Sequence, residues 1–128
     1  MSVKVSQGIK IKVETNYLNE YSKPAVNHFL FSYRITIENQ NPFAVQLLRR
    51  HWFIKDSSSC MRQVEGEGVV GQMPVIESGS SYSYESGCNL TSDMGSMKGS
   101  YKFIRLSDDS TFEADIPEFN LAAPWKSN

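Results

Sequence analysis

The segment 64–71 holds the residues whose spacing is most suggestive of chemistry. It reads V-E-G-E-G-V-V-G, so Gly66, Gly68 and Gly71 have the spacing G-x-G-x-x-G. Turns with this spacing bind phosphate through backbone N–H groups when they join a buried strand to the first turn of a helix. The spacing therefore raises the hypothesis of a nucleotide site.

The neighbouring residues argue against a phosphate site. Pro74 and the Gly/Ser-rich residues 77–81 disfavour a long helix after the glycines. Two carboxylates within the segment, those of Glu65 and Glu67, would repel a pyrophosphate. We therefore expect no tight binding of ATP, NAD or diadenosine tetraphosphate, and favour a strand that bulges or lets an aromatic ring lie against its glycines. The candidate rings are those of Trp52, Tyr82 and Tyr84.

Arg50 and Trp52 lie two residues apart on a predicted strand, and we expect them to share one face with Leu48 and Ile54. Arginine and tryptophan are favoured anchors of protein interfaces, so this face is a candidate binding site. The alternative is that the arginine stem packs beside Trp52 while the guanidinium pairs with a carboxylate. The candidate carboxylates are those of Asp56, Glu65 and Glu67.

The histidines and cysteines show no spacing that predicts a metal site. His28 and His51 are the two histidines, and neither shares a local motif with Cys60 or Cys88. The cysteines form no C-x-x-C pair, and we expect both to be buried, reduced and unreactive. The chain also has no nucleophile elbow of the type G-x-S-x-G. We therefore expect no metal, no cofactor and no catalytic residues.

Alternation of apolar and polar residues with a period of two dominates the chain and predicts β-strands. The clearest example is 29–37, in which every second residue is aromatic or β-branched. Strands are predicted over 9–13, 29–37, 45–56, 62–71, 80–90, 97–106 and 112–116, with turns at 57–59 and 107–110. No stretch has the spacing of an amphipathic helix. The pattern indicates an all-β chain folded as a fibronectin type III or immunoglobulin-like antiparallel β-sandwich of about seven strands.

Length and charge limit the organisation and the partners. A chain of 128 residues is expected to form a single domain, 1–128, with a short flexible tail after about residue 121. Its 13 basic and 14 acidic residues give a formal net charge of -1, so nucleic acid and anionic membranes are not expected partners. No apolar run is long enough for a membrane helix, and residues 1–5 do not begin a signal peptide. We expect a cytoplasmic protein.

Five segments, taken in order along the chain, resemble the motifs of one protein family. They are V-Q-L-L-R-R-H-W-F-I-K-D at 45–56, G-E-G-V-V-G-Q-M-P at 66–74, S-G-C-N-L at 86–90, G-S-M-K-G-S-Y at 95–101 and I-P-E-F-N-L at 116–121. The family is that of the bacterial ApaG proteins, which the chain resembles over nearly its whole length. The resemblance implies a fibronectin type III-like β-sandwich, in agreement with the alternation along the strands.

The resemblance implies little about function. The family takes its name from a gene beside a diadenosine tetraphosphate hydrolase, and some members are linked to cobalt resistance and magnesium efflux. Related domains end certain eukaryotic F-box proteins, where a protein-binding role is proposed. The family offers no catalytic residues that would carry over to this chain.

From these observations we expect a non-enzymatic binding module that acts on another protein, through edge-strand addition or through an aromatic and arginine patch. A homodimer is one form that such an interaction would take. The alternative is a small-molecule or ion binder, with a nucleotide phosphate at 66–71 or a divalent metal, and an enzyme is the third hypothesis. The residues expected to carry binding are Arg50, Trp52, Glu65, Gly66, Gly68 and Gly71.

Overall fold

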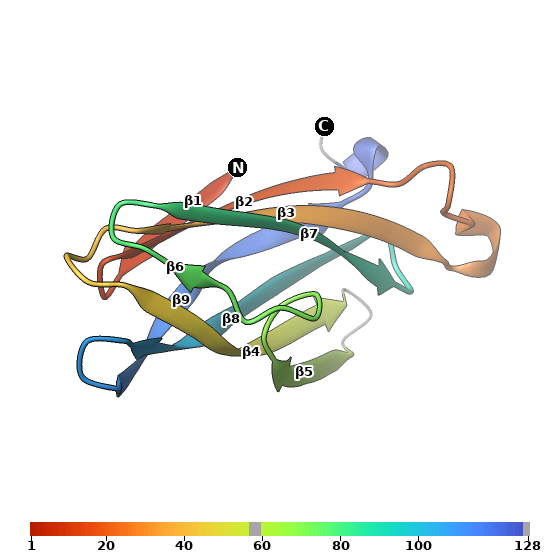
Figure 1. The fold of residues 1–128 in the computed structure, drawn as a ribbon. Helices are drawn as coiled ribbons and strands as arrows, with labels where there is room; N and C mark the ends of the chain where they lie inside the picture. Colours follow the sequence, from red (N-terminus) through yellow and green to blue (C-terminus); the bar gives the residue numbers. More distant parts are fainter. Residues whose placement is uncertain (57–59, 127–128) are drawn as a thin grey trace.

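The computed structural model describes residues 1–56 and 60–126, which form two antiparallel β-sheets packed face to face (Figure 1). The first sheet has the strand order β1-β2-β3-β7. Its strands are β1 (Ser2–Ser6), β2 (Ile9–Tyr17), β3 (Phe29–Asn39) and β7 (Ser81–Leu90). The 3₁₀ turn η1 (Pro24–Val26) lies between β2 and β3.

In the part of the chain that the structure describes, no helix has the length and apolar character needed to cross a membrane.

The second sheet has the order β5-β4-β8-β9, and the short strand β6 (Val75–Ile76) pairs with the start of β4. Its longer strands are β4 (Val45–Asp56), β5 (Met61–Glu67), β8 (Met94–Arg105) and β9 (Ser110–Ala122). A second 3₁₀ turn, η2 (Pro124–Lys126), follows β9. The predicted all-β antiparallel sandwich is confirmed. Among the described residues it has nine strands, because β1 and β6 add to the seven that were predicted.

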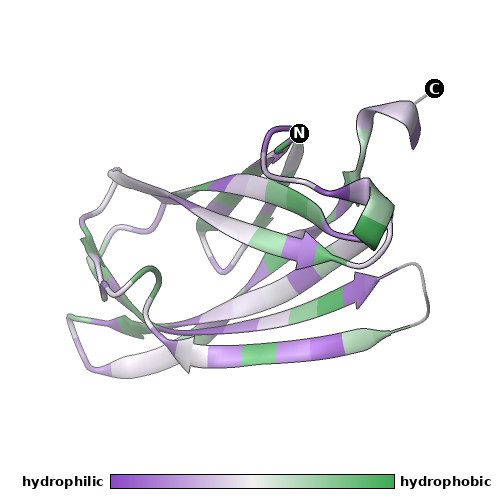
Figure 2. Cartoon of the chain, turned by 90° about the vertical axis from the view of Figure 1, so that its right-hand side faces the viewer, coloured by the Kyte–Doolittle hydropathy of each residue, from purple (hydrophilic) through white to green (hydrophobic). Residues whose placement is uncertain are grey.

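Alternation of apolar residues puts one face of each sheet into the core, and it is visible in Figure 2 as changes of colour along the strands. In β3 every second residue from Phe29 to Asn39 is buried, while the residues between them are exposed or half-buried. Burial of one aliphatic side chain stabilises the fold by roughly 1.5–3 kcal/mol. The fully buried residues include Ile9, Ile11, Ile35, Ile37, Leu47, Tyr101 and Phe103.

A β-bulge at Leu48 decides which residues of β4 face the core. The pairing of β4 with β8 shifts between Leu47 and Arg49, so Leu48 is an extra residue in the strand. The bulge reverses the alternation, so that Leu47 is buried before it and Trp52 is buried after it. The prediction that Leu48 shares a face with Arg50 and Trp52 is therefore wrong: Leu47 is the buried leucine before the bulge, and the bulge turns Arg50 and Trp52 inward.

β9 continues beyond Pro117, where the sequence predicted that the strand would end. The pairing of β9 with β8 shifts between Met97 and Gly99, and Pro117 lies opposite this irregularity. A proline is tolerated at such a place, because its missing N–H has no regular ladder partner. The strand therefore runs on to Ala122.

Residues 122–126 pack against the sandwich, whereas the sequence predicted a flexible tail after about residue 121. Ala123 is fully buried. The ring of Trp125 meets the ring of Tyr17 edge-on, with 5.6 Å between the centroids, and its Nε1 donates a 2.7 Å hydrogen bond to Asp93 Oδ2. These contacts hold the segment 122–126 against β2 and the start of β8.

The predicted hairpin turn at 107–110 is present between β8 and β9. Asp108 Oδ1 accepts hydrogen bonds from the backbone N and the hydroxyl of Ser110, and these bonds lower the pKa of Asp108. The turn predicted at 57–59 lies outside the described residues.

The two flanks of the sandwich differ. On one flank β1 lies against β9: Lys4 Nζ is 3.3 Å from Asp115 Oδ2, and Ser6 Oγ accepts a 2.9 Å hydrogen bond from the backbone N of Asp115. On the other flank the outermost strands are β7 of the first sheet and β5 of the second (Figure 1). The described part of the sandwich is therefore closed at β1 and β9 and open between β5 and β7.

Candidate functional site

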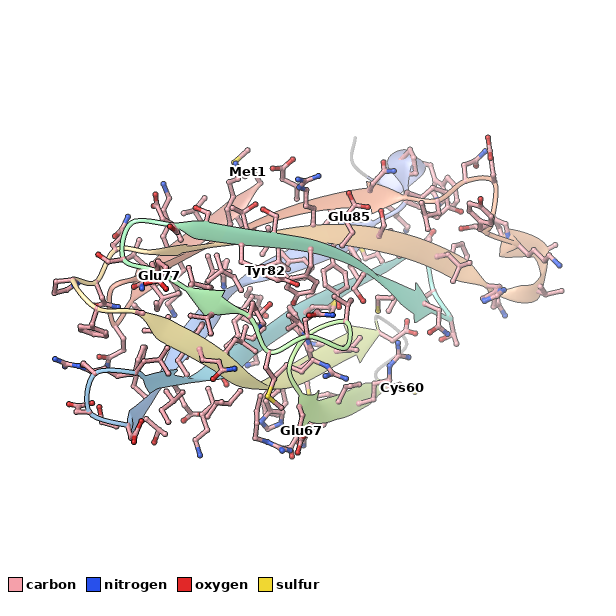
Figure 3. The ribbon with its side chains drawn as sticks, in the orientation of Figure 1. Met1, Cys60, Glu67, Glu77, Tyr82 and Glu85 are labelled. Atoms are coloured by element: carbon pink, nitrogen blue, oxygen red, sulfur yellow. The ribbon has the colours of Figure 1, made fainter. Side chains whose placement is uncertain are left out.

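A cleft of about 390 Å³ lies at the open flank, between the two sheets. β4 and β5 form one wall and β7 forms the other; in Figure 3, Cys60 and Glu67 label the two ends of the β5 region, and Tyr82 labels β7. The polar side chains of the lining are those of Tyr33, Arg50, Arg62, Tyr84, Ser86 and Asn89. The apolar ones include Trp52, Ile54, Val64, Val69, Cys88 and Met97.

The pairing of β4 with β5 brings both arginines of the cleft to one inner face. The pairs are Arg62 with Ile54, Val64 with Trp52, and Gly66 with Arg50. Because alternate residues of a strand share a face, the even-numbered residues of β5 point inward with these partners. Arg62 was not among the residues singled out from the sequence. It could have been identified from its position four residues before Gly66, because residues an even number apart on a strand point to the same face.

Backbone carbonyl groups hold Arg50 in place. Its Nη1 donates hydrogen bonds of 2.9 Å to Glu67 O and 3.0 Å to Gly68 O. Its guanidinium lies against Gly66, where an added Cβ would come within 2.8 Å of Nη2. Two expectations are corrected: a guanidinium, and not an aromatic ring, packs against this glycine, and it binds carbonyl oxygens instead of a carboxylate.

The remainder of the G-x-G-x-x-G segment forms a tight hairpin turn. Val69 and Gln72 exchange two backbone hydrogen bonds, of 2.8 and 2.9 Å. The residues between them, Val70 and Gly71, have φ of 43° and 79°. Positive φ at both central positions is the geometry of a type I′ turn. Gly68, with φ of 61°, brings the chain into this turn.

Three backbone N–H groups of this turn, those of Gly68, Val69 and Gln72, already have acceptors within the chain. Gly68 N donates to Leu48 O at 2.8 Å, and the N–H groups of Val69 and Gln72 close the hairpin. The next element along the chain is the strand β6, not a helix. A phosphate cradle needs N–H groups that converge on its ligand. The glycines of this segment therefore serve the turn and the packing of Arg50.

Glu65 lies on the outer face of β5, away from the cleft. Its Oε1 is 3.1 Å from His51 Nε2, which also lies 3.0 Å from Gln63 Oε1. Of the two predicted binding residues, Arg50 lines the cleft and Glu65 does not. Both line a second, smaller hollow of about 240 Å³.

Trp52 forms the floor of the cleft and belongs to the core. It is 3% exposed. Its ring contacts those of Tyr33, Tyr101 and Phe119 edge-on, at centroid distances of 5.5, 6.4 and 5.9 Å. Such contacts stabilise the fold and give the cleft a rigid base.

Arg62 crosses the open flank from β5 to β7. Its Nη2 donates a 2.7 Å hydrogen bond to Asn89 O and lies 3.5 Å from Cys88 Sγ. Burial raises the pKa of the Cys88 thiol, and the positive charge of Arg62 offsets part of this rise. Arg62 and Gly66 are about 13 Å apart along β5, from a rise of about 3.3 Å per residue, so the two arginines stand near opposite ends of the cleft.

Three buried tyrosines lie at the cleft: Tyr33 and Tyr84 line it, and Tyr101 lies beneath them. The hydroxyl groups of Tyr84 and Tyr101 share a short hydrogen bond, and burial raises the pKa of both. Burial also raises the pKa of Tyr33, while a hydrogen bond with Ser86 acts in the opposite direction. All three side chains are therefore neutral near pH 7 and supply hydroxyl groups without charge.

The cleft has two positive charges and no carboxylate. Among the described residues that line it, Arg50 and Arg62 are the charged ones. Within residues 1–56 and 60–126, neither guanidinium has an acidic oxygen within 4.0 Å. Guanidinium groups stay protonated at physiological pH. The cleft is therefore an anion-attracting site on a chain whose formal net charge is -1.

The cysteines differ in their surroundings. Both are free thiols, but Cys88 is buried and Cys60 is exposed, so the expectation of burial is wrong for Cys60. Cys60 lies just before the edge strand β5, where a side chain has little to pack against. In the described part of the chain, no group of three or more His, Cys, Asp or Glu side chains could hold a metal ion.

Comparison with known proteins gives one consistent result. A family model described as the ApaG domain matches residues 19–105. A protein named ApaG from Pseudomonas aeruginosa (strain LESB58) is 46% identical over 116 residues, which cover 91% of each chain. Another from Brucella suis biovar 1 (strain 1330) is 42% identical over 120 residues, 94% of this chain and 92% of the relative. The crystal structure of a Bordetella pertussis protein named ApaA is 35% identical, with a TM-score of 0.87, and the match covers 91% of this chain and 94% of that one.

Proposed function

The chain belongs to the ApaG domain family, and we propose that it is a non-enzymatic module that binds another protein. In this proposal an extended segment of the partner adds to the free edge of β5, and its side chains enter the adjoining cleft. The proposal rests on one observation: β5 is an edge strand, and the cleft lies directly beside it.

The backbone of β5 offers hydrogen-bonding groups to an added strand. Asp56 N donates to Cys60 O, and Gly68 N donates to Leu48 O. Because bonded and non-bonded pairs alternate along an antiparallel ladder, the even-numbered residues of β5 direct their backbone groups toward β4. The backbone groups that point to the free edge are those of Met61, Gln63, Glu65 and Glu67. Because Glu67 O already accepts a hydrogen bond from Arg50 Nη1, an added strand would pair mainly with Met61, Gln63 and Glu65.

Apolar side chains accompany this edge. Met61, on β5, is 59% exposed, while Val64 and Val70 are exposed and line the cleft. β5 contains no proline, which is one of the residues that protect natural strand edges from pairing. The charged side chains of Arg62, Glu65 and Glu67 oppose pairing with an arbitrary strand, so the edge favours a strand whose charges complement them.

The chemistry of the cleft supports binding instead of catalysis. Its tyrosines are neutral near pH 7, well below the ordinary tyrosine pKa of about 10, which burial raises further. Its guanidinium groups are protonated, so neither type of side chain accepts a proton at that pH. A role in cobalt resistance or magnesium efflux, which the family resemblance implies, would be exerted through the partner protein. We place this interaction in the cytoplasm.

Affinity capture tests the proposal. Wild-type protein, Gln63→Pro and Gln63→Ala are used to capture proteins from a cytoplasmic extract, and the captured proteins are identified by mass spectrometry. Gln63→Pro removes an N–H group from the free edge, whereas Gln63→Ala removes the same side chain and keeps that group. We expect the partner to bind the wild type and Gln63→Ala but not a folded Gln63→Pro protein. Equal capture by all three would rule out pairing at β5, and capture of a second copy of this chain would identify a homodimer.

A further inference from the structure

We propose that the segment received at β5 is acidic, and that Arg50 and Arg62 bind carboxylate groups at two of its inward-facing positions. The inward side chains of such a segment read acidic, apolar, acidic at positions i, i+2 and i+4. This inference rests on the proposed strand addition, and it names the chemistry of the partner.

Gly66 allows an added strand to reach Arg50. Arg50 lies on β4, one strand in from the edge, and a side chain at position 66 would stand between its guanidinium and a strand added to β5. Because Gly66 has no side chain, the guanidinium occupies that space, within 2.8 Å of where a Cβ would lie. Its bonds to Glu67 O and Gly68 O hold it there. A partner residue opposite Gly66 therefore faces a positive charge at the edge.

Arg62 presents the second charge four residues away on the same face of β5. The Cβ atoms of residues directly opposite one another on paired strands lie about 4.5–5.5 Å apart. A partner carboxylate opposite Arg62 would therefore bind the N–H groups of the guanidinium that are not used in the bond from Nη2 to Asn89 O. The partner residue between these two positions lies opposite Val64, which favours an apolar side chain. Guanidinium and carboxylate groups form charge-assisted, often bidentate hydrogen bonds, and the cleft has no carboxylate of its own among the described residues.

The outer face of β5 has the opposite charge. Glu65 and Glu67 are exposed there, on the face turned away from the cleft. Like charges directly opposite one another in a sheet are destabilising. Acidic residues on the outward face of the partner are therefore disfavoured. We expect β5 to prefer a segment whose acidic side chains point inward over one with equally many that point outward.

Three synthetic peptides test this selection by titration calorimetry of the full chain at low salt. Ac-TETVTET-NH₂ has the acidic residues at the inward positions, Ac-TTEVETT-NH₂ has the same composition with a different spacing, and Ac-TQTVTQT-NH₂ has no charge. We expect the first peptide to bind at least about tenfold more tightly than the other two, because hydrogen bonds between charged groups strengthen binding by about this factor or more. Its affinity should fall as salt is added.

Substitutions then locate the bound peptide. Arg62→Gln should weaken binding of the first peptide about tenfold and leave the uncharged peptide unaffected. The matched control is Arg49→Gln, which removes the same charge from an exposed side chain on β4 and should change nothing. Arg50→Gln should act like Arg62→Gln if a thermal melt shows that it is folded; Arg62→Gln decides the question if it is not.

The outcomes distinguish this inference from the proposed function. Equal binding of the three peptides, absence of binding, or equal losses in Arg62→Gln and Arg49→Gln would each overturn the assignment of an acidic partner. Strand addition itself is judged by the capture experiment, because Gln63→Pro leaves both arginines in place.

Discussion

The guanidinium of Arg50 lies in the space that a side chain at Gly66 would occupy. The two residues are paired across β4 and β5, and the guanidinium is bonded to the carbonyl groups that follow the glycine. The glycine and the arginine therefore form one structural unit, and a change in one should be measurable at the other.

Replacing Gly66 with alanine should displace the Arg50 guanidinium and lower the free energy of unfolding by about 1–2 kcal/mol, because hydrogen bonds from a charged group are lost. Urea unfolding measures the loss, and the NMR signal of Arg50 Nε reports the displacement. Gly87→Ala is the control, since Gly87 lies on the other edge strand and an added Cβ there makes only an ordinary 3.4 Å contact with Phe31 O. An Arg50 signal that is unchanged in Gly66→Ala would contradict the assignment.

Gly68→Ala should be more destabilising than Gly71→Ala. Both glycines have positive φ, which costs an L-residue roughly 1–2 kcal/mol. At Gly71 an added Cβ meets open space, but at Gly68 it collides with the backbone carbonyl of Gln72, which adds roughly 1–3 kcal/mol of overpacking. Urea midpoints of the two variants give the comparison. Equal losses would show that the hairpin turn moves to accommodate the new side chain.

Trp52→Ala should reduce the free energy of unfolding by roughly 3–5 kcal/mol, because it empties a core position. Trp125 is 48% exposed, so Trp125→Ala should cost only roughly 1–2 kcal/mol. Because the chain has two tryptophans, each single variant also isolates the fluorescence of the other. Blue-shifted emission is expected when Trp52 is the one that remains. A larger loss from Trp125→Ala than from Trp52→Ala would place the C-terminal segment, and not the cleft floor, at the centre of stability.

One thiol should react quickly with Ellman's reagent and the other slowly. Cys60 is exposed, whereas Cys88 is buried and its pKa is raised by burial, so less of its reactive thiolate is present at pH 8. Labelling of Cys88 should accelerate as the pH rises and when urea opens the fold. In Cys60→Ser the fast phase should disappear; a fast phase that persists would show that Cys88 is accessible.

Stability should fall above about pH 10, the ordinary pKa of tyrosine. The pKa values of Tyr33, Tyr84 and Tyr101 are raised in the folded state, so the unfolded chain loses these protons first and is favoured as the pH rises. Urea midpoints at pH 8, 9.5 and 10.5 measure the effect. Tyr101→Phe should make the decline shallower, while Tyr21→Phe removes an exposed hydroxyl and serves as the control. If stability declined equally with pH in both variants, ionisation of Tyr101 would not explain the decline.

Most strands could be predicted from the sequence because a two-residue period requires only that one face be buried. The strand predicted at 45–56 has the bounds of β4, and the alternation in 29–37 identified β3. Both strands could be predicted from local alternation alone, without information on which strands pair with them.

The inner face of the candidate site could not be predicted in this way. Positions 47 and 48 are both leucine, and the sequence does not show which of them is the extra residue of the bulge. The error at Leu48 and the omission of Arg62 share this cause, because both depend on how β4 pairs with its two neighbours. The packing of Trp125 on Tyr17 was missed for a related reason: it joins residues far apart in the chain.

The closed flank has a consequence for how this domain combines with others. β1 begins at one edge of its sheet and β9 lies at the far edge of the other, whereas the cleft lies between the opposite edges, β5 and β7. The first and the last strand of the described chain, β1 and β9, thus both lie on the flank away from the cleft. A second protein fused genetically to either end would therefore start from the side away from the cleft. Such a fusion should leave peptide recognition intact, which makes the fold suitable as an interchangeable unit of longer, multidomain chains.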